Sequence, residues 1–117
     1  IHGGAWQYGD KARQGQPLMH FLAARGWIAV AINYRLCPRE RFPAPLVDCK
    51  RAIAWVREHV ATFGGDPSFI AVTGGSAGAH LATLVALTAN RPELQPGFAA
   101  EDTSVAACVP FYGVYDF

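Results

Sequence analysis

A five-residue stretch, Gly74-Gly75-Ser76-Ala77-Gly78, has the residue types and the spacing of a nucleophile elbow, G-x-S-x-G. In such an elbow, a tight turn between a strand and a helix lifts a serine hydroxyl clear of the sheet, where it can attack a carbonyl carbon. Side chains two positions before and after the serine would collide with the neighbouring strand and helix, so glycines are expected there. The pattern predicts that Ser76 is a catalytic nucleophile supported by Gly74 and Gly78; the alternative is a glycine-rich turn with an incidental serine.

A second stretch, His2-Gly3-Gly4-Ala5-Trp6, suits a complementary task. Acyl transfer needs backbone N–H donors aimed at a tetrahedral oxyanion, and glycines let a loop bend so that these groups face inward. Gly3 and Gly4 are the predicted oxyanion-hole donors, with the N–H of Ala77 as a third. His2 opens the loop, and we interpret it as holding the loop in shape by hydrogen bonding, in preference to acting as a general base.

The other histidines point to no further chemistry. His80 follows Ser76 by four residues, so on a helix it approaches from the packed side, and a core histidine is favoured over a base. His20 and His59 fall in amphipathic helical patterns without acidic or thiol partners at ligand spacing. No metal site is predicted.

Three short apolar runs are typical of strands covered on both faces, and Ile1 is expected to end a fourth. Apolar residues recurring at spacings of three and four indicate helices between these runs. Strands that alternate with helices predict an α/β fold with a mainly parallel sheet and helices on both faces. The predicted strands are 27–32, 68–73 and 105–111, and the predicted helices are 17–25, 45–62 and 77–89.

Composition excludes several classes of function. The 117 residues suffice for one core, and 51% of them are hydrophobic. Ten basic and nine acidic residues give a net charge of +1 and are scattered along the chain, so neither nucleic acid nor an acidic lipid surface is an expected partner. The longest uncharged apolar run, 79–89, is too short to cross a bilayer. Three widely spaced cysteines suggest reduced thiols and favour a cytoplasmic location.

Four motifs together resemble the hormone-sensitive-lipase-like esterases of the α/β-hydrolase superfamily, and especially bacterial carboxylesterases with an H-G-G-A-W loop. The resemblance spans essentially the whole chain. It implies hydrolysis of carboxylic esters of small molecules without a metal or organic cofactor, with Ser76 as nucleophile and Gly3, Gly4 and Ala77 as oxyanion donors. The motifs are His2-Gly3-Gly4-Ala5-Trp6, Asn33-Tyr34-Arg35-Leu36-Cys37-Pro38, Gly65-Asp66-Pro67 and Gly75-Ser76-Ala77-Gly78.

The same resemblance implies a catalytic acid and a histidine base on loops after the seventh and eighth strands of the family's sheet. We expect residues 1–117 to be a partial catalytic domain that holds the third to sixth strands and lacks those two residues. The carboxylates Asp48, Asp66 and Asp116 match no position of the family's acid. Ala5 replaces the third glycine of the commoner H-G-G-G motif, which should narrow the space beside the donors.

Two alternatives remain open. The first is an amidase resembling kynurenine formamidases, which share an H-G-G-x-W loop and an elbow like residues 76–80. Ester and amide cleavage use the same acyl-enzyme route, so the motifs do not separate them. The second is a non-catalytic binding protein on the hydrolase fold, because function resides in the site and not in the fold. An elbow and an oxyanion loop that are both intact favour an enzyme.

Overall fold

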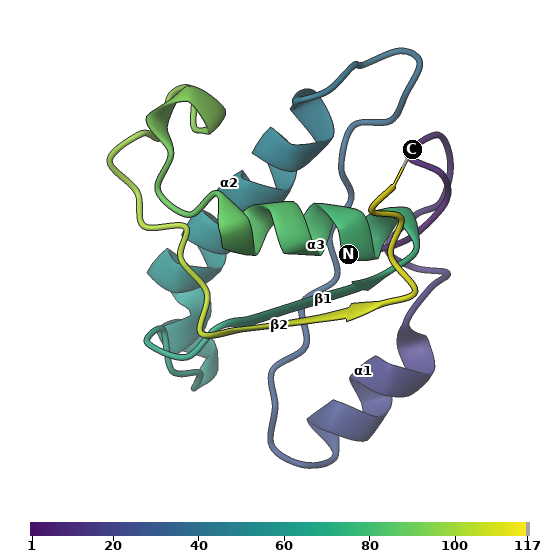
Figure 1. Cartoon of the computed structure of the whole chain (residues 1–117). Helices are drawn as coiled ribbons and strands as arrows, with labels where there is room; N and C mark the ends of the chain where they lie inside the picture. The colour runs from purple at the N-terminus through teal and green to yellow at the C-terminus, as the bar shows by residue number, and fades with distance from the viewer. Residues whose placement is uncertain (117) are drawn as a thin grey trace.

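Two parallel strands lie at the centre of the structure, a computed structural model that describes residues 1–116 (Figure 1). Strand β1 (Ala71–Gly75) pairs with strand β2 (Ala107–Phe111), in a register that runs from Ala71 opposite Ala107 to Gly75 opposite Phe111. The chain passes from one strand to the other through a helix, as a parallel pair requires. The strands predicted at 68–73 and 105–111 are confirmed, although both begin two to three residues later.

The three predicted helices are confirmed to within a few residues at each end. Helix α3 packs on both strands and α2 packs on α3, while Figure 1 shows α1 apart from both, beyond the strand pair. The parallel strand pair joined through a helix agrees with the α/β fold predicted from the sequence. The helical elements are α1 (Gln16–Ala23), α2 (Ala44–His59), the 3-10 turn η1 (Val60–Phe63), α3 (Ala77–Leu87) and the 3-10 turn η2 (Pro92–Leu94).

The hydrophobic core lies between α2 and α3. The core residues of α2 recur at spacings of three and four, which places them on one face of that helix. Two buried residues of α3, Leu81 and Val85, pack against this face. Burial raises the pKa of the Cys49 thiol to about 12, so this cysteine stays protonated and acts as a small apolar residue. The cluster consists of Leu46, Cys49, Ile53, Leu81 and Val85, with Tyr34 and Ile70 from the adjoining segments.

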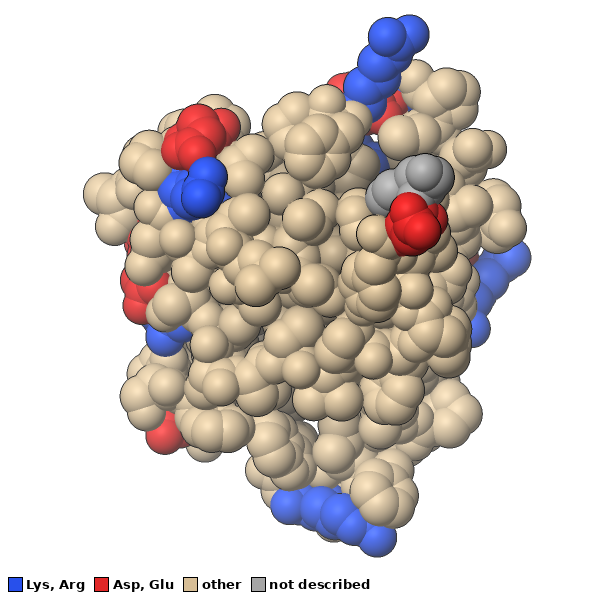
Figure 2. All heavy atoms as spheres, viewed as in Figure 1, with Lys and Arg blue, Asp and Glu red and all other residues tan. Residues whose placement is uncertain are grey.

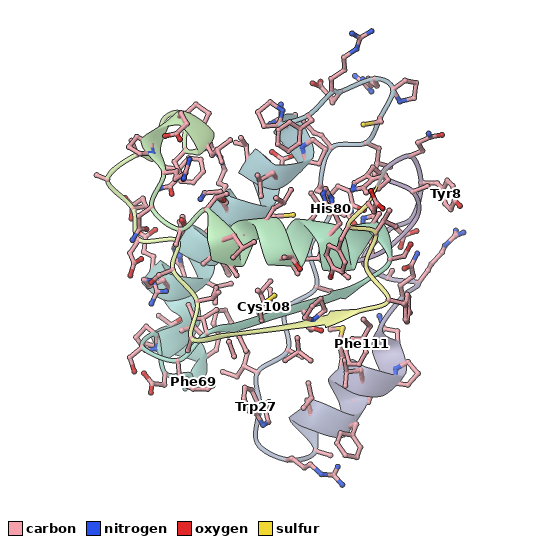
Figure 3. All side chains as sticks on the ribbon, in the orientation of Figure 1. Tyr8, Trp27, Phe69, His80, Cys108 and Phe111 are labelled. Carbon is pink, nitrogen blue, oxygen red and sulfur yellow. The ribbon has the colours of Figure 1, made fainter. Side chains whose placement is uncertain are left out.

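The strand predicted at 27–32 is not formed, although this segment is as apolar as β1. A groove of about 1150 Å³ separates it from β1, and residues of both segments and of α1 line that groove. A strand exists only when a second backbone satisfies its N–H and C=O groups, and no other segment of residues 1–116 pairs with 27–32. At one end, Trp27 meets Phe69 edge to face at 6.0 Å (Figure 3). The apolar side chains of Trp27, Ile28 and Val30 are left between 42% and 47% exposed.

The segment 90–104 is a compact excursion held by a buried polar network. The hydroxyl of Thr103 donates to Oε1 of Gln95 at 2.7 Å, and both side chains are fully buried. The Thr103 N–H donates to Oδ1 of Asn90 at 2.8 Å, while Nε2 of Gln95 donates to the carbonyls of Phe98 and Glu101. Because these polar groups satisfy one another, the excursion has a structural explanation and needs no functional one.

Charged side chains in Figure 2 sit around the rim of the face in view, and most of that face is uncharged. Some charged side chains are paired: Nε of Arg35 lies 2.8 Å from Oδ2 of Asp48, which joins the segment 33–45 to α2. Among residues 1–116, no helix is long and apolar enough to cross a bilayer.

Candidate active site

Ser76 sits at the turn between β1 and α3 in a backbone conformation that side chains rarely adopt. Its φ is 55° and its ψ is −122°. Its N–H donates to the carbonyl of Phe111 at 3.0 Å, which ties the turn to the end of β2. A serine held in this way is strained locally, and the strain persists because the strand and the helix on either side are packed. The strained turn expected of a nucleophile elbow is therefore present.

The glycines at either side of Ser76 allow three backbone segments to approach closely. A Cβ on Gly74 would lie 2.4 Å from the carbonyl oxygen of Gly78 and 2.7 Å from that of Ile1. A Cβ on Gly78 would lie 2.3 Å from the oxygen of Ile1 and 2.5 Å from that of His2. Real Cβ atoms do not come this close to backbone, so neither position accepts a side chain without movement. Packing of the neighbouring backbone therefore requires glycine at both positions.

Helix α3 begins directly after Ser76 and carries no charged residue. Ala77 is fully buried at its first position, where the backbone N–H has no acceptor within the helix. At the opposite end, the buried ammonium of Lys50 donates to the carbonyl of Thr88 and, at 3.3 Å, to its hydroxyl. Burial lowers the pKa of Lys50. The positive N-terminal end of the α3 dipole therefore lies at Ser76, and the Lys50 ammonium lies at its negative C-terminal end.

The glycine loop at residues 2–6 lies directly beside the elbow. A Cβ on Gly3 would lie 3.4 Å from that of Ser76. The chain then reverses at Gly4, whose φ of 126° favours glycine and whose carbonyl accepts the N–H groups of Gln7 at 2.9 Å and Tyr8 at 3.0 Å. A Cβ on Gly4 would come within 2.0 Å of the Tyr8 carbonyl oxygen. The predicted nucleophile and the predicted oxyanion loop are thus neighbours in space.

His2 anchors the start of this loop. Its ring stacks on Tyr34 at 4.3 Å, and its Nδ1 lies 2.8 Å from the carbonyl oxygen of Gly3. The hydroxyl of Tyr34 in turn donates to the His2 carbonyl at 2.9 Å, and burial raises the pKa of Tyr34. These contacts hold the ring of His2 against its own loop. The sequence placed Tyr34 in a motif but gave no sign that it would reach His2.

Gln14 is a neighbour of the site that sequence reasoning missed. Its Oε1 accepts the N–H of Gly3 at 2.8 Å, and its Nε2 donates to the Gly3 carbonyl at 3.3 Å. The Gly3 N–H therefore has an acceptor within the protein, whereas the sequence assigned it to the oxyanion. No pattern in the sequence marks a glutamine eleven residues away as a partner of a glycine loop.

The remaining histidines lie on helices. The half-buried ring of His80 meets Trp6 edge to face at 5.3 Å, and burial lowers its pKa (Figure 3). His59 stacks on Trp55 at 4.5 Å, with Nδ1 2.8 Å from the Trp55 carbonyl oxygen. His20 belongs to the last turn of α1. Within the described part of the chain, no three His, Cys, Asp or Glu side chains form a group that could hold a metal ion.

Two of the carboxylates left unassigned from the sequence have structural partners. Asp48 binds the guanidinium of Arg35 through both oxygens, at 2.8 to 3.1 Å. Asp66 accepts the N–H and the hydroxyl of Ser68, and these hydrogen bonds lower its pKa.

Comparison with known proteins places this geometry in a family. The BD-FAE family matches residues 1–117. The chain is 61% identical over 117 residues to the probable carboxylic ester hydrolase LipM and 60% identical over 116 residues to esterase LipQ, both from Mycobacterium tuberculosis. It covers 100% and 99% of its own length in these matches, but only 27% and 28% of the two relatives.

A solved structure agrees with the fold. The apo form of Thermogutta terrifontis esterase 2 matches 97% of the chain at a TM-score of 0.82 and 38% identity, over 42% of its own length. The same esterase has been solved with propionate bound, with butyrate bound and phosphonylated by cyclosarin. The chain belongs to the BD-FAE family, among the hormone-sensitive-lipase-like esterases of the α/β-hydrolase superfamily.

Proposed function

We propose that the protein containing this chain is a serine carboxylesterase that cleaves short-to-medium acyl esters through an acyl-enzyme on Ser76. The observation that carries the proposal is the strained Ser76, with φ of 55°, lying beside a loop that reverses at Gly4, with φ of 126°. Backbone strain of this kind clusters at active sites. Close relatives named as ester hydrolases support the same conclusion.

The reaction follows from the positions of these groups. Ser76 Oγ attacks the ester carbonyl, its proton passes to a base, and the carbonyl oxygen becomes an oxyanion. The N–H groups of Gly4 and Ala77 stabilise that oxyanion, and the positive pole of α3 favours the same charge. The alcohol then leaves with a proton from the base, and water releases the acid from the acyl-enzyme by the reverse steps.

The base is assigned outside residues 1–116. The Nδ1 atoms of His2 and His59 each lie 2.8 Å from a backbone carbonyl oxygen, which fixes both rings against the chain that carries them. The half-buried ring of His80 lies on the helix that begins at the elbow, with Trp6 edge to face against it. The proposed base is therefore the histidine that the family resemblance places on a later loop.

The proposed acyl group is small. Ala5 follows Gly4 in the loop with a φ of 49°, and its methyl group narrows the space next to the donors relative to a third glycine. The related Thermogutta esterase binds propionate and butyrate, the acids released from short acyl esters. A p-nitrophenyl butyrate is accordingly the first substrate to assay.

A fluorophosphonate probe tests the proposal, because it reacts with an activated serine. In the whole protein, mass spectrometry should find the probe on the peptide that contains Ser76. Ser76→Ala should remove the labelling and reduce kcat by about 10⁶-fold without unfolding the protein, because little buried area is lost. Ser68→Ala removes an exposed hydroxyl bonded to Asp66 and serves as the matched control. Labelling at any other residue would overturn the assignment.

A further inference from the structure

We propose that Gln14 is a positioning residue of the oxyanion loop, which aims the N–H of Gly4 by holding the peptide groups on both sides of Gly3. The inference rests on the proposed function, because it concerns the same site. It starts from the side-chain amide of Gln14, whose two ends bond to the two backbone polar groups of one residue, Gly3.

The geometry of the peptide links Gln14 to Gly4. The carbonyl of Gly3 and the N–H of Gly4 belong to one planar trans peptide unit, so they point in opposite directions. Two side-chain nitrogens contact the Gly3 carbonyl oxygen: Nε2 of Gln14 at 3.3 Å and Nδ1 of His2 at 2.8 Å. Rotation of this unit would break both contacts, so they hold the Gly4 N–H in its direction on the opposite side of the unit.

The oxygen of the Gln14 amide binds the Gly3 N–H, which was predicted from the sequence to be an oxyanion donor. Oε1 accepts the Gly3 N–H at 2.8 Å, a normal hydrogen-bond length. Gly3 is buried and lies against the elbow, where a Cβ would come 2.8 Å from the Gly75 oxygen. Gly3 is thus the fixed base of the loop, and Gly4 and Ala77 are left as donors for the oxyanion.

Gln14 is distinguished from its neighbours by where its side chain reaches. Within the described chain, the side-chain bonds of the other residues at 10–16 stay inside that stretch: Asp10 with Ala12 and Arg13, and Gln16 with the carbonyls of Lys11 and Ala12. Gln14 instead spans eleven residues to Gly3. A side chain needed only to fold its own stretch has no reason to leave it.

Steady-state kinetics of Gln14→Ala in the whole protein tests this role. A preorganised donor acts on the transition state, so kcat should fall about tenfold while KM stays within about twofold. Gln16→Ala is the control, because it removes another amide of the same stretch that does not touch Gly3. An unchanged kcat in Gln14→Ala, or a change confined to KM, would overturn the inference.

A second variant gives a readout that a merely structural role would not move. Gln14→Glu presents two acceptors when ionised and one donor plus one acceptor when protonated, and only the protonated form can copy the amide. The ratio of its kcat to that of the wild type should therefore rise as pH falls from 7 toward 5, approaching the ordinary carboxyl pKa of about 4.3. A flat ratio would overturn the inference even if Gln14→Ala failed to fold. If the proposed function itself is wrong, the wild-type protein will neither react with the fluorophosphonate probe nor hydrolyse the ester. This outcome differs from a loss of activity confined to the Gln14 variants.

Discussion

Strand β1 and the segment 27–32 are alike in sequence and differ in structure. Both are short apolar runs that predict buried strands, and they face each other across the groove. β1 pairs with β2 along its whole length on one side, and on the other its Thr73 carbonyl accepts the nitrogen of Ile1 at 2.8 Å. Segment 27–32 faces the groove and forms no strand.

The contrast shows that some structures are determined by their own residues and others by a partner segment. The elbow at the end of β1 is determined locally, because Gly74, Ser76 and Gly78 permit a turn that other residues would block. A strand is determined by its partner, because its backbone polar groups need a second backbone. The elbow is therefore formed within residues 1–116, although the sheet of this described part consists of one strand pair.

Among the substitutions that test this comparison, Gly4→Val in the glycine loop is expected to have the largest effect. The new side chain would have to displace the Tyr8 carbonyl, from which a Cβ would be only 2.0 Å away, and the φ of 126° is closed to a β-branched residue. In the whole protein, kcat should fall by at least the ~10²-fold typical of losing one oxyanion donor. Gly15→Ala, with open space around its Cβ, is the control. A kcat near wild type with a raised KM would mean that the loop binds substrate only.

A substitution at Gly78 tests how tightly the elbow is packed. Helix propensity alone predicts that Gly78→Ala stabilises α3 by about 1 kcal/mol. The contacts of 2.3 and 2.5 Å predict the opposite, a loss of about 1–3 kcal/mol in the free energy of unfolding, measured by denaturant titration. A more stable Gly78→Ala protein would show that the three segments can separate.

Hydrogen exchange compares the two apolar runs directly. In a protein limited to residues 1–117, the amides of 28–32 should exchange at least about tenfold faster than those of β1, because no ladder protects them. Exchange detected by NMR, residue by residue, gives the comparison. Equal protection in both runs would mean that 27–32 has found a backbone partner in solution, such as a second copy of the chain.

The smallest effect concerns the pH dependence of stability near the elbow. Burial lowers the pKa of His80 below its unfolded value, so the unfolded chain binds a proton more readily than the folded one. Stability should fall as pH drops through about 6.5, and thermal unfolding at pH 7 and pH 5 measures the loss. His80→Gln should show a smaller drop in Tm between these pH values than the wild type. An unchanged drop in His80→Gln would assign the effect to other groups.

Sequence patterns predicted the parts of the molecule that depend on neighbours along the chain. The periodicity of Leu46, Cys49 and Ile53 located α2, and the glycines around Ser76 located the elbow. Contacts between distant side chains and backbone left no such pattern: Tyr34 reaches His2 across 32 residues and Gln14 reaches Gly3 across 11. The prediction of a strand at 27–32 was wrong. An apolar sequence indicates that a segment prefers to be buried, but a strand also needs a partner strand, and the segment's own residues cannot supply one.

The contacts at the two ends of α3 have a mechanical consequence. At its beginning, Gly78 lies against the backbone of Ile1 and His2. Beyond its end, the Lys50 ammonium donates a hydrogen bond to the Thr88 carbonyl. A helix stopped at both ends cannot slide along its own axis, and its packing on both strands prevents it from tilting. The hydroxyl of Ser76 is thus a stationary reference point. Any adjustment to substrates of different size therefore has to come from residues other than Ser76 and the helix that follows it.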